Sequence, residues 1–146
     1  MRRERLQALL GIKTTILEAS TSRDIDAAFA KAVELKVGAL VMGPDPYFDS
    51  RLDKFAALAT RFAMPTIHAL GEFVTSGGLM SYGADLANAY RLVGIYTGRI
   101  LKGEKPADLP VQQSTKAELA VNLKTAKTLG LTVPQSVLAT ADKMIE

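Results

Sequence analysis

The sequence predicts an α/β fold in which helices flank a mostly parallel sheet. Segments of helical periodicity alternate with short apolar runs, in the order helix, strand, helix, strand, helix, strand. The run at 39–42 is continuously apolar, which is typical of a strand covered on both faces. Alternation at this spacing favours right-handed crossovers. We therefore expect about four or five strands, with 39–42 and 66–69 adjacent and parallel.

The amino-terminal half supplies these alternating elements. β-Branched residues at 13–19 predict a strand, and Ser22 can cap a helix that carries one apolar stripe. A further helix begins near Asp49 and turns apolar side chains inward. Pro65 then marks the start of a strand at 66–70.

The second half is organised around a strand, a tight polar turn and the longest helix. Residues 79–81 predict a short buried strand, and residues 82–85 turn the chain into a helix at 85–102. Gly103 ends that helix, where a residue with positive φ costs least. A Pro-rich connection follows, and the remaining expected elements are a strand at 118–122 and short helical pieces at 123–129 and 134–145.

The composition of the chain limits its function. It has 146 residues, of which 48% are hydrophobic and 23% charged, as in ordinary soluble domains. The net charge is only +3, so neither nucleic acid nor a membrane surface is expected as a partner. With no cysteine and one histidine, the usual pairs of nucleophile and base cannot be assembled, and we expect neither an enzyme nor a cofactor. His68 lies in an apolar strand without metal-ligating neighbours and is expected to make an ordinary hydrogen bond.

The first ten residues begin with basic side chains, as a secretory signal does. Residues 2–10 are also typical of the last turns of an amphipathic helix. The apolar run stops at Ile12 and has no adequate hydrophobic region or cleavage site, so we expect no signal peptide, and the chain as written would be cytoplasmic if expressed. No stretch approaches the roughly 18 to 20 apolar residues that span a bilayer.

Three stretches carry a specific resemblance. They read GGLMSYGAD at 77–85, ILKGEKPADLPVQQ at 100–113 and NLKTAKTLGLTVP at 122–134. Together with PDP at 44–46 and EFV at 72–74, they resemble the substrate-binding proteins of one bacterial ABC transporter family, whose better-known members take up tryptophan or tyrosine. The resemblance covers essentially the whole chain, but only the carboxyl-terminal half of a family member.

The resemblance implies a two-lobed fold of the periplasmic-binding-protein type I-like kind, here truncated, that closes over a solute like a hinge. Residues 1–80 would be part of the second lobe, and residues 81–109 a strand and helix belonging to the first. Residues 110–146 would form the return crossover and the carboxyl-terminal helices. The implied partners are a small-molecule solute and, in the full-length parent, the ABC permease subunits. The family is periplasmic, and one cause would explain both the missing first half and the missing signal.

Candidate ligand contacts lie just past the carboxyl ends of predicted strands, where open α/β sheets bind small molecules. In the first loop, Asp45 could pair with an ammonium group and Tyr47 could stack on a ligand side chain. The alternative there is a Pro-Asp-Pro turn, with Asp49 capping the next helix. In the second loop Glu72 and Phe73 are candidates, and the alternative is a solvated acid and a core aromatic residue.

The third loop holds Ser81, Tyr82 and Asp85 at the start of the long helix. Its hydroxyl groups and the free N–H groups of a helix start could receive a carboxylate. Asp85 could cap the helix, contact a ligand, or do both. The alternative is capping alone, with Tyr82 packed against the protein.

We therefore expect a solute-binding component, or a fragment of one, of an ABC-type importer, with an aromatic amino acid or a similar small molecule as ligand. The alternative is a flavodoxin-like or receiver-like interaction domain, although only Asp45 matches its expected acidic cluster. A chain lacking one cleft wall should bind its solute at least about tenfold more weakly than an intact homologue. The helix at 85–102 would expose apolar side chains, so self-association by exchange of that helix is also expected.

Overall fold

The computed structural model describes residues 11–112 and 117–146. By its contacts the chain divides into two compact units, Met1–Val37 and Gly38–Glu146. The amphipathic helix expected at 2–10 lies outside the described residues. Within the described ranges, no helix combines the length and the apolar character that crossing a membrane requires.

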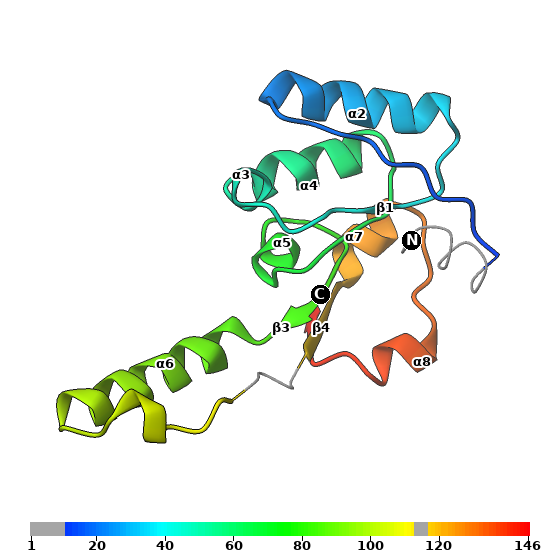
Figure 1. Cartoon of the computed structure of the whole chain (residues 1–146). Helices are drawn as coiled ribbons and strands as arrows, with labels where there is room; N and C mark the ends of the chain where they lie inside the picture. Colours follow the sequence, from blue (N-terminus) through cyan, green and yellow to red (C-terminus); the bar gives the residue numbers. More distant parts are fainter. Residues whose placement is uncertain (1–10, 113–116) are drawn as a thin grey trace. The chain divides into compact units, whose positions relative to one another are not determined.

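The first unit contains helix α2, Ser22–Glu34 (Figure 1). Thr21 is its N-cap, not the expected Ser22: the Thr21 hydroxyl accepts a hydrogen bond from the Asp24 N–H at 3.2 Å, and Asp24 Oδ2 accepts one from the Thr21 N–H at 2.8 Å. This reciprocal pair is a capping box. The hydrogen bond from the Thr21 side chain is the largest cause that holds the pKa of Asp24 below its usual value.

The strand expected at 13–19 is wrong. Residues 11–19 have no regular secondary structure. β-Branched residues form a strand only where a neighbouring strand takes up their backbone hydrogen bonds, and the described sheet pairs other segments.

The second unit is built on one sheet. Its five described strands lie side by side in chain order, β1-β2-β3-β4-β5. The pairs β1–β2, β2–β3 and β4–β5 are parallel, and β3–β4 is antiparallel. The expected mostly parallel sheet is confirmed, with Leu40 opposite Thr66 and Val41 opposite Ile67. The strands are β1 (Leu40–Val41), β2 (Thr66–His68), β3 (Met80–Ala84), β4 (Ala117–Asn122) and β5 (Lys143–Ile145).

Short helices connect these strands. The exception is the longer helix α6, which follows the end of β3 (Figure 1). The helices of this unit are α3 (Pro46–Asp49), α4 (Leu52–Arg61), α5 (Glu72–Thr75), α6 (Leu86–Leu101), the 3-10 turn η1 (Pro106–Asp108), α7 (Leu123–Thr128) and α8 (Gln135–Leu138).

Pairing between strands makes two predicted element boundaries wrong. The turn expected at 82–85 is wrong, because Tyr82, Gly83 and Ala84 continue β3 by pairing with β4. The helix expected at 134–145 ends after one turn, and the chain then forms β5. Asp142 holds the chain beside β4 just before β5 begins. Its N–H donates to the Leu119 carbonyl at 2.8 Å, and its Oδ2 accepts from the Leu119 N–H at 2.9 Å.

Asp49 does not cap the next helix. It is the last residue of α3, and α4 begins after Arg51, which makes no side-chain capping bond. The expected inward face of α4 is otherwise present, since Leu52, Phe55, Leu58 and Ala59 are buried.

The core beside α5 is closely packed. Phe73 is completely buried, and Gly78 makes room for it, since a Cβ on Gly78 would lie 2.3 Å from the Phe73 ring. Asn122, also buried, donates from Nδ2 to the Val74 carbonyl at 3.2 Å and accepts at Oδ1 from the Thr125 N–H at 2.9 Å. These bonds join α5, β4 and α7 without leaving the amide unpaired.

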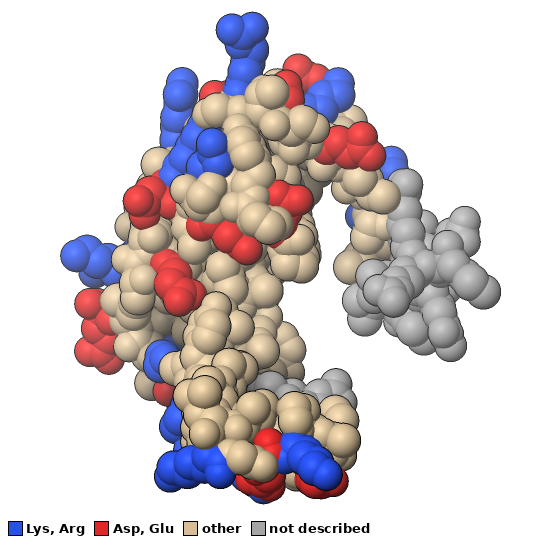
Figure 2. Space-filling model, turned by 60° about the vertical axis from the view of Figure 1, so that its left-hand side comes forward, with Lys and Arg blue, Asp and Glu red and all other residues tan. Residues whose placement is uncertain are grey.

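Helix α6 is largely apolar, yet its side chains are exposed or partly exposed to solvent. Its cap is Asp85, which accepts from the Asn88 N–H at 2.9 Å, and Gly103 follows its end with φ +98°, as expected. None of its residues, all of which the structure describes, is buried. In Figure 2 acidic and basic atoms are intermixed, and α6 in the lower part of the view is mostly uncharged with charges gathered at its far end.

Candidate functional site

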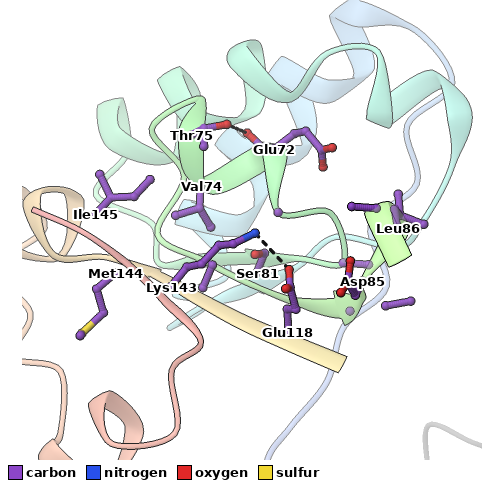
Figure 3. Close-up of a pocket in the computed structure, with 16 residues that line it drawn as sticks. Glu72, Val74, Thr75, Ser81, Asp85, Leu86, Glu118, Lys143, Met144 and Ile145 are labelled. Carbon is purple, nitrogen blue, oxygen red and sulfur yellow. Dashed lines mark hydrogen bonds and ion pairs between the residues drawn. The ribbon is translucent and has the colours of Figure 1, made fainter. Parts of the chain in front are cut away.

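A cavity of about 410 Å³ opens on one face of the sheet in the second unit (Figure 3). Its walls come from the start of α5, the start of α6 and the three strands β3, β4 and β5. The lining residues used below are Glu72, Val74, Ser81, Gly83, Asp85, Leu86, Glu118, Ala120, Lys143 and Ile145.

Strand register builds the floor of the cavity. Ser81 lies opposite Ala120, and Ala120 lies opposite Lys143, so the three side chains share one face of the sheet. Glu118, two residues before Ala120, faces the same way. The residue Ser81 is only 2% exposed, and it lines the cavity from β3. A serine hydroxyl can both donate and accept a hydrogen bond, so Ser81 brings a polar group to the cavity.

An ion pair crosses this floor. Lys143 Nζ lies 3.2 Å from Glu118 Oε2, with side chains 67% and 25% exposed (Figure 3). Asp142 fixes the start of β5 next to β4 by its bonds to Leu119, and so holds Lys143 opposite Ala120, within reach of Glu118. An exposed pair of this kind adds little stability, but it neutralises one carboxylate of the cavity.

Two further carboxylates face the cavity from helix starts. Asp85 uses Oδ1 to cap α6, which leaves Oδ2 for another partner. Glu72 is the first residue of α5 and is exposed, and its backbone carbonyl accepts a hydrogen bond from the Thr75 hydroxyl at 2.9 Å. Apolar side chains of Val74, Leu86 and Ile145 complete the walls. The cavity therefore combines an apolar surface with more negative than positive charge.

The cavity brings together three of the residues predicted from the sequence, Glu72, Ser81 and Asp85. Phe73 lies beneath α5 in the core. Tyr82 is 60% exposed and, by strand alternation, faces away from Ser81.

The other two predicted residues, Asp45 and Tyr47, lie at α3 and do not line this cavity. Asp45 caps α3 by accepting from the Tyr47 N–H at 2.8 Å. The Tyr47 ring is covered by the Arg51 guanidinium, whose carbon lies 3.6 Å from the ring centroid.

Sequence reasoning missed Glu118 and Lys143. Lys143 fell in the helix wrongly expected at 134–145, so no strand face was assigned to it. Glu118 opened a correctly expected strand, and its alternation with Ala120 would have placed both side chains on one face. Among the described residues, no group of three or more Asp, Glu or His side chains could hold a metal ion.

Residues 4–145 match the family model described as ABC transporter substrate binding protein, and the chain belongs to that family. Among solved structures, it is similar to a conserved domain protein from Vibrio cholerae O1 biovar El Tor, with 28% identity and a TM-score of 0.82. It is also similar to an ABC domain from Streptococcus pneumoniae in complex with L-Trp, with 26% identity and a TM-score of 0.80.

A ligand-free, open substrate-binding protein from Clostridium difficile shares the fold, with 23% identity, a TM-score of 0.68 and 97% of this chain covered. The alignments with the Vibrio and Streptococcus structures cover 97% and 99% of this chain but only 47% and 51% of theirs. The chain thus spans about half the length of the structures it matches. No curated protein matches it.

Proposed function

We propose that this chain is the solute-binding part of an ABC importer component and that the cavity beside α5 binds a small molecule with a protonated amine and an apolar body. The observation that carries the proposal is the juxtaposition of Glu72, Asp85 and the hydroxyl-bearing Ser81 around one cavity. The volume of about 410 Å³ is in the range of small-molecule sites.

The negative charge of the cavity lining favours a ligand that carries a protonated amine. Glu118 is paired with Lys143, and this lysine is the only basic side chain among the described residues that line the cavity, so Glu72 and Asp85 give the lining an excess of negative charge. An ammonium group would offset this excess negative charge, and the apolar walls suit a ring or an aliphatic chain. An aromatic amino acid is the best candidate, because the similar Streptococcus domain was solved with L-Trp.

The remaining predicted residues take supporting parts in this proposal. Phe73 supports α5 from below. Asp45 and Tyr47 follow β1 and so lie at the same edge of the parallel strands as Glu72. Tyr82 lies on the other face of β3 and would meet a ligand only from that side.

The family suggests the setting in which the protein works. We infer that the protein acts outside the cytoplasmic membrane, delivers its solute to ABC permease subunits and performs no catalysis. We also infer a lobe division at 1–80, 81–109 and 110–146, in which β3 and β4 are crossovers between lobes.

Titration calorimetry of the chain with L-Trp tests the site. Asp85→Asn removes the negative charge but keeps an N-cap, because Asn caps as well as Asp, so any loss of binding reports on charge. We expect Asp85→Asn and Ser81→Ala each to weaken binding about tenfold, as the loss of one charge-assisted or buried hydrogen bond predicts.

The control is Asp108→Asn in η1, an equal charge change away from the cavity, which should leave binding unchanged. Tight binding of a sugar or nucleoside, with no binding of any amino acid, would refute the proposed solute class.

The open face of α6 supports a second expectation, that the chain self-associates. Tyr90, Val93 and Leu101 are 73%, 61% and 83% exposed on this helix. We expect light scattering to show growth in mass with concentration up to roughly 100 micromolar, where weak association becomes visible. Val93→Lys should reduce it, whereas Val111→Lys, at a fully exposed residue outside α6, should not. A monomer across the whole series would contradict the expectation.

A further inference from the structure

His68 is the only histidine of the chain, and its side chain is completely buried at the carboxyl end of β2. Its ring packs edge-on against Phe73, with centroids 6.0 Å apart and planes at 64°. It lies opposite Ser81 in the β2–β3 register, one strand from the cavity floor. The proposed ligand contacts do not include it.

The two ring nitrogens have different partners. Nδ1 accepts a hydrogen bond from the Leu70 N–H at 3.1 Å, so it carries a lone pair and, in the neutral ring, the proton lies on Nε2. Nε2 points towards Asp49 Oδ1 at 3.3 Å. Both of these atoms are buried and have no aligned hydrogen bond in the described part of the chain. A small rotation of either side chain would complete an N–H to carboxylate bond.

Leu70, which donates to His68 Nδ1, lies two residues before the start of α5, and α5 lines the cavity. The Leu70 and Gly71 carbonyls accept from the N–H groups of Phe73 and Val74 at 3.1 and 3.0 Å and so open α5. Glu72, the first residue of α5, presents its carboxylate to the cavity. Whatever fixes the Leu70 N–H therefore fixes the start of α5.

We propose that His68, in its neutral form with the proton on Nε2, is a positioning residue that sets the turn from β2 into α5 and thereby places Glu72 at the cavity, and that Asp49 selects this tautomer. The link to ligand binding rests on the proposed function, whereas the link between His68 and the turn does not.

Protonation of the His68 ring should disrupt the turn between β2 and α5. A proton on Nδ1 would face the Leu70 N–H, and two donors cannot bond to each other. Burial lowers the pKa of His68 below its ordinary 6.5, while Asp49 from α3 and Glu72 from α5 act in the opposite direction. The strands β1 and β3 beside it carry no charged side chain.

The sign of the pH effect follows from this lowered pKa. The unfolded chain takes up the proton near pH 6.5 and the folded chain only at lower pH, so stability is complete above that range. It is lost progressively as the pH falls from about 6.5 to the folded value.

Nitrogen-15 NMR of the full chain tests the assignment, and a single histidine gives unambiguous ring signals. We expect the Nε2–H tautomer at pH 7.5 and a Leu70 amide signal that titrates with the same midpoint as His68. Asp49→Asn should lower that midpoint, because it removes an attraction for the imidazolium, and Asp53→Asn on α4 should not. An Nδ1–H tautomer, or a Leu70 amide that ignores the titration, would overturn the proposal.

Two substitutions separate positioning from general packing. The oxygen of His68→Asn occupies the place of Nδ1 and can still accept from the Leu70 N–H, whereas the longer His68→Gln reaches towards Asp49 instead. At pH 7.5 we expect His68→Asn to bind L-Trp at least about fivefold more tightly than His68→Gln, the worth of one neutral hydrogen bond, and to lose the pH dependence of the original chain. Equal binding by the two variants would overturn the positioning role. If the unsubstituted chain does not bind L-Trp but the NMR result holds, only the proposed solute fails.

Discussion

Replacing Phe73 by alanine is expected to lower the free energy of unfolding by about 3–5 kcal/mol, the usual cost of removing a fully buried aromatic ring. The Phe73 side chain is completely buried beneath α5, contacts the His68 ring, and leaves no room for a Cβ on Gly78. Urea denaturation followed by circular dichroism measures the loss as a lower midpoint at constant slope. Phe62→Ala, at a partly exposed ring, should cost less, and equal costs would contradict the assignment of Phe73 to the core.

The contact between Phe73 and Gly78 allows a sharper measurement. Gly78→Ala alone should destabilise the protein, because the new Cβ would lie 2.3 Å from a ring carbon of Phe73. In the Phe73→Ala background that overlap is gone, so the same change should cost nothing there. A double-mutant cycle should therefore give a coupling energy of at least about 1 kcal/mol, and additive effects would show that the two residues do not touch.

Gly83→Ala is expected to cost about 2–3 kcal/mol, the upper part of the range for overpacking. A Cβ at Gly83 would lie 2.1 Å from the Ala69 carbonyl oxygen, which is backbone and cannot rotate away. The chain after β2 and strand β3 would have to separate. Because Ala69 and Gly83 both line the cavity, the solute binding that we propose should weaken as well.

Gly94→Ala is the matched control for this change. Gly94 lies inside α6, and apart from its chain neighbours and the backbone of its own helix no described atom lies within 4 Å of its Cβ position, so alanine there should stabilise the helix by up to about 1 kcal/mol. Thermal unfolding should thus shift in opposite directions for the two glycines. A shift of the same sign in both variants would contradict the close approach at Gly83.

Much of the fold could be predicted where the local pattern and the tertiary environment agree. The apolar run at 39–42 and Pro65 marked the positions of β1 and β2. The expected cover on both faces is wrong for β1, because Val41 is 83% exposed. Asp85 and Gly103 marked the ends of α6, because caps depend on local backbone chemistry alone.

The failures that concern strands have one physical origin, which is pairing between distant segments. Residues 13–19 have strand composition but no strand in the described sheet, and β5 was expected as helix because three residues carry too little pattern to show that β4 pairs with them. Because β5 was not predicted, Lys143 and its ion pair with Glu118 were not predicted as part of the site either. Positions just after predicted strands were more informative, and they led to Glu72, Ser81 and Asp85, which all line the same cavity.

The order of the strands in the sheet bears on how the protein is made. Each strand lies beside the one that precedes it in the chain, so a polypeptide leaving the ribosome at about 5–20 residues per second always adds to an edge that is already present. Among the five described strands, none has to enter between two earlier strands that have already paired, as happens in sheets whose central strands come last. The order of translation and the order of assembly can therefore coincide, and each new edge needs protection from neighbouring chains only until the next strand emerges.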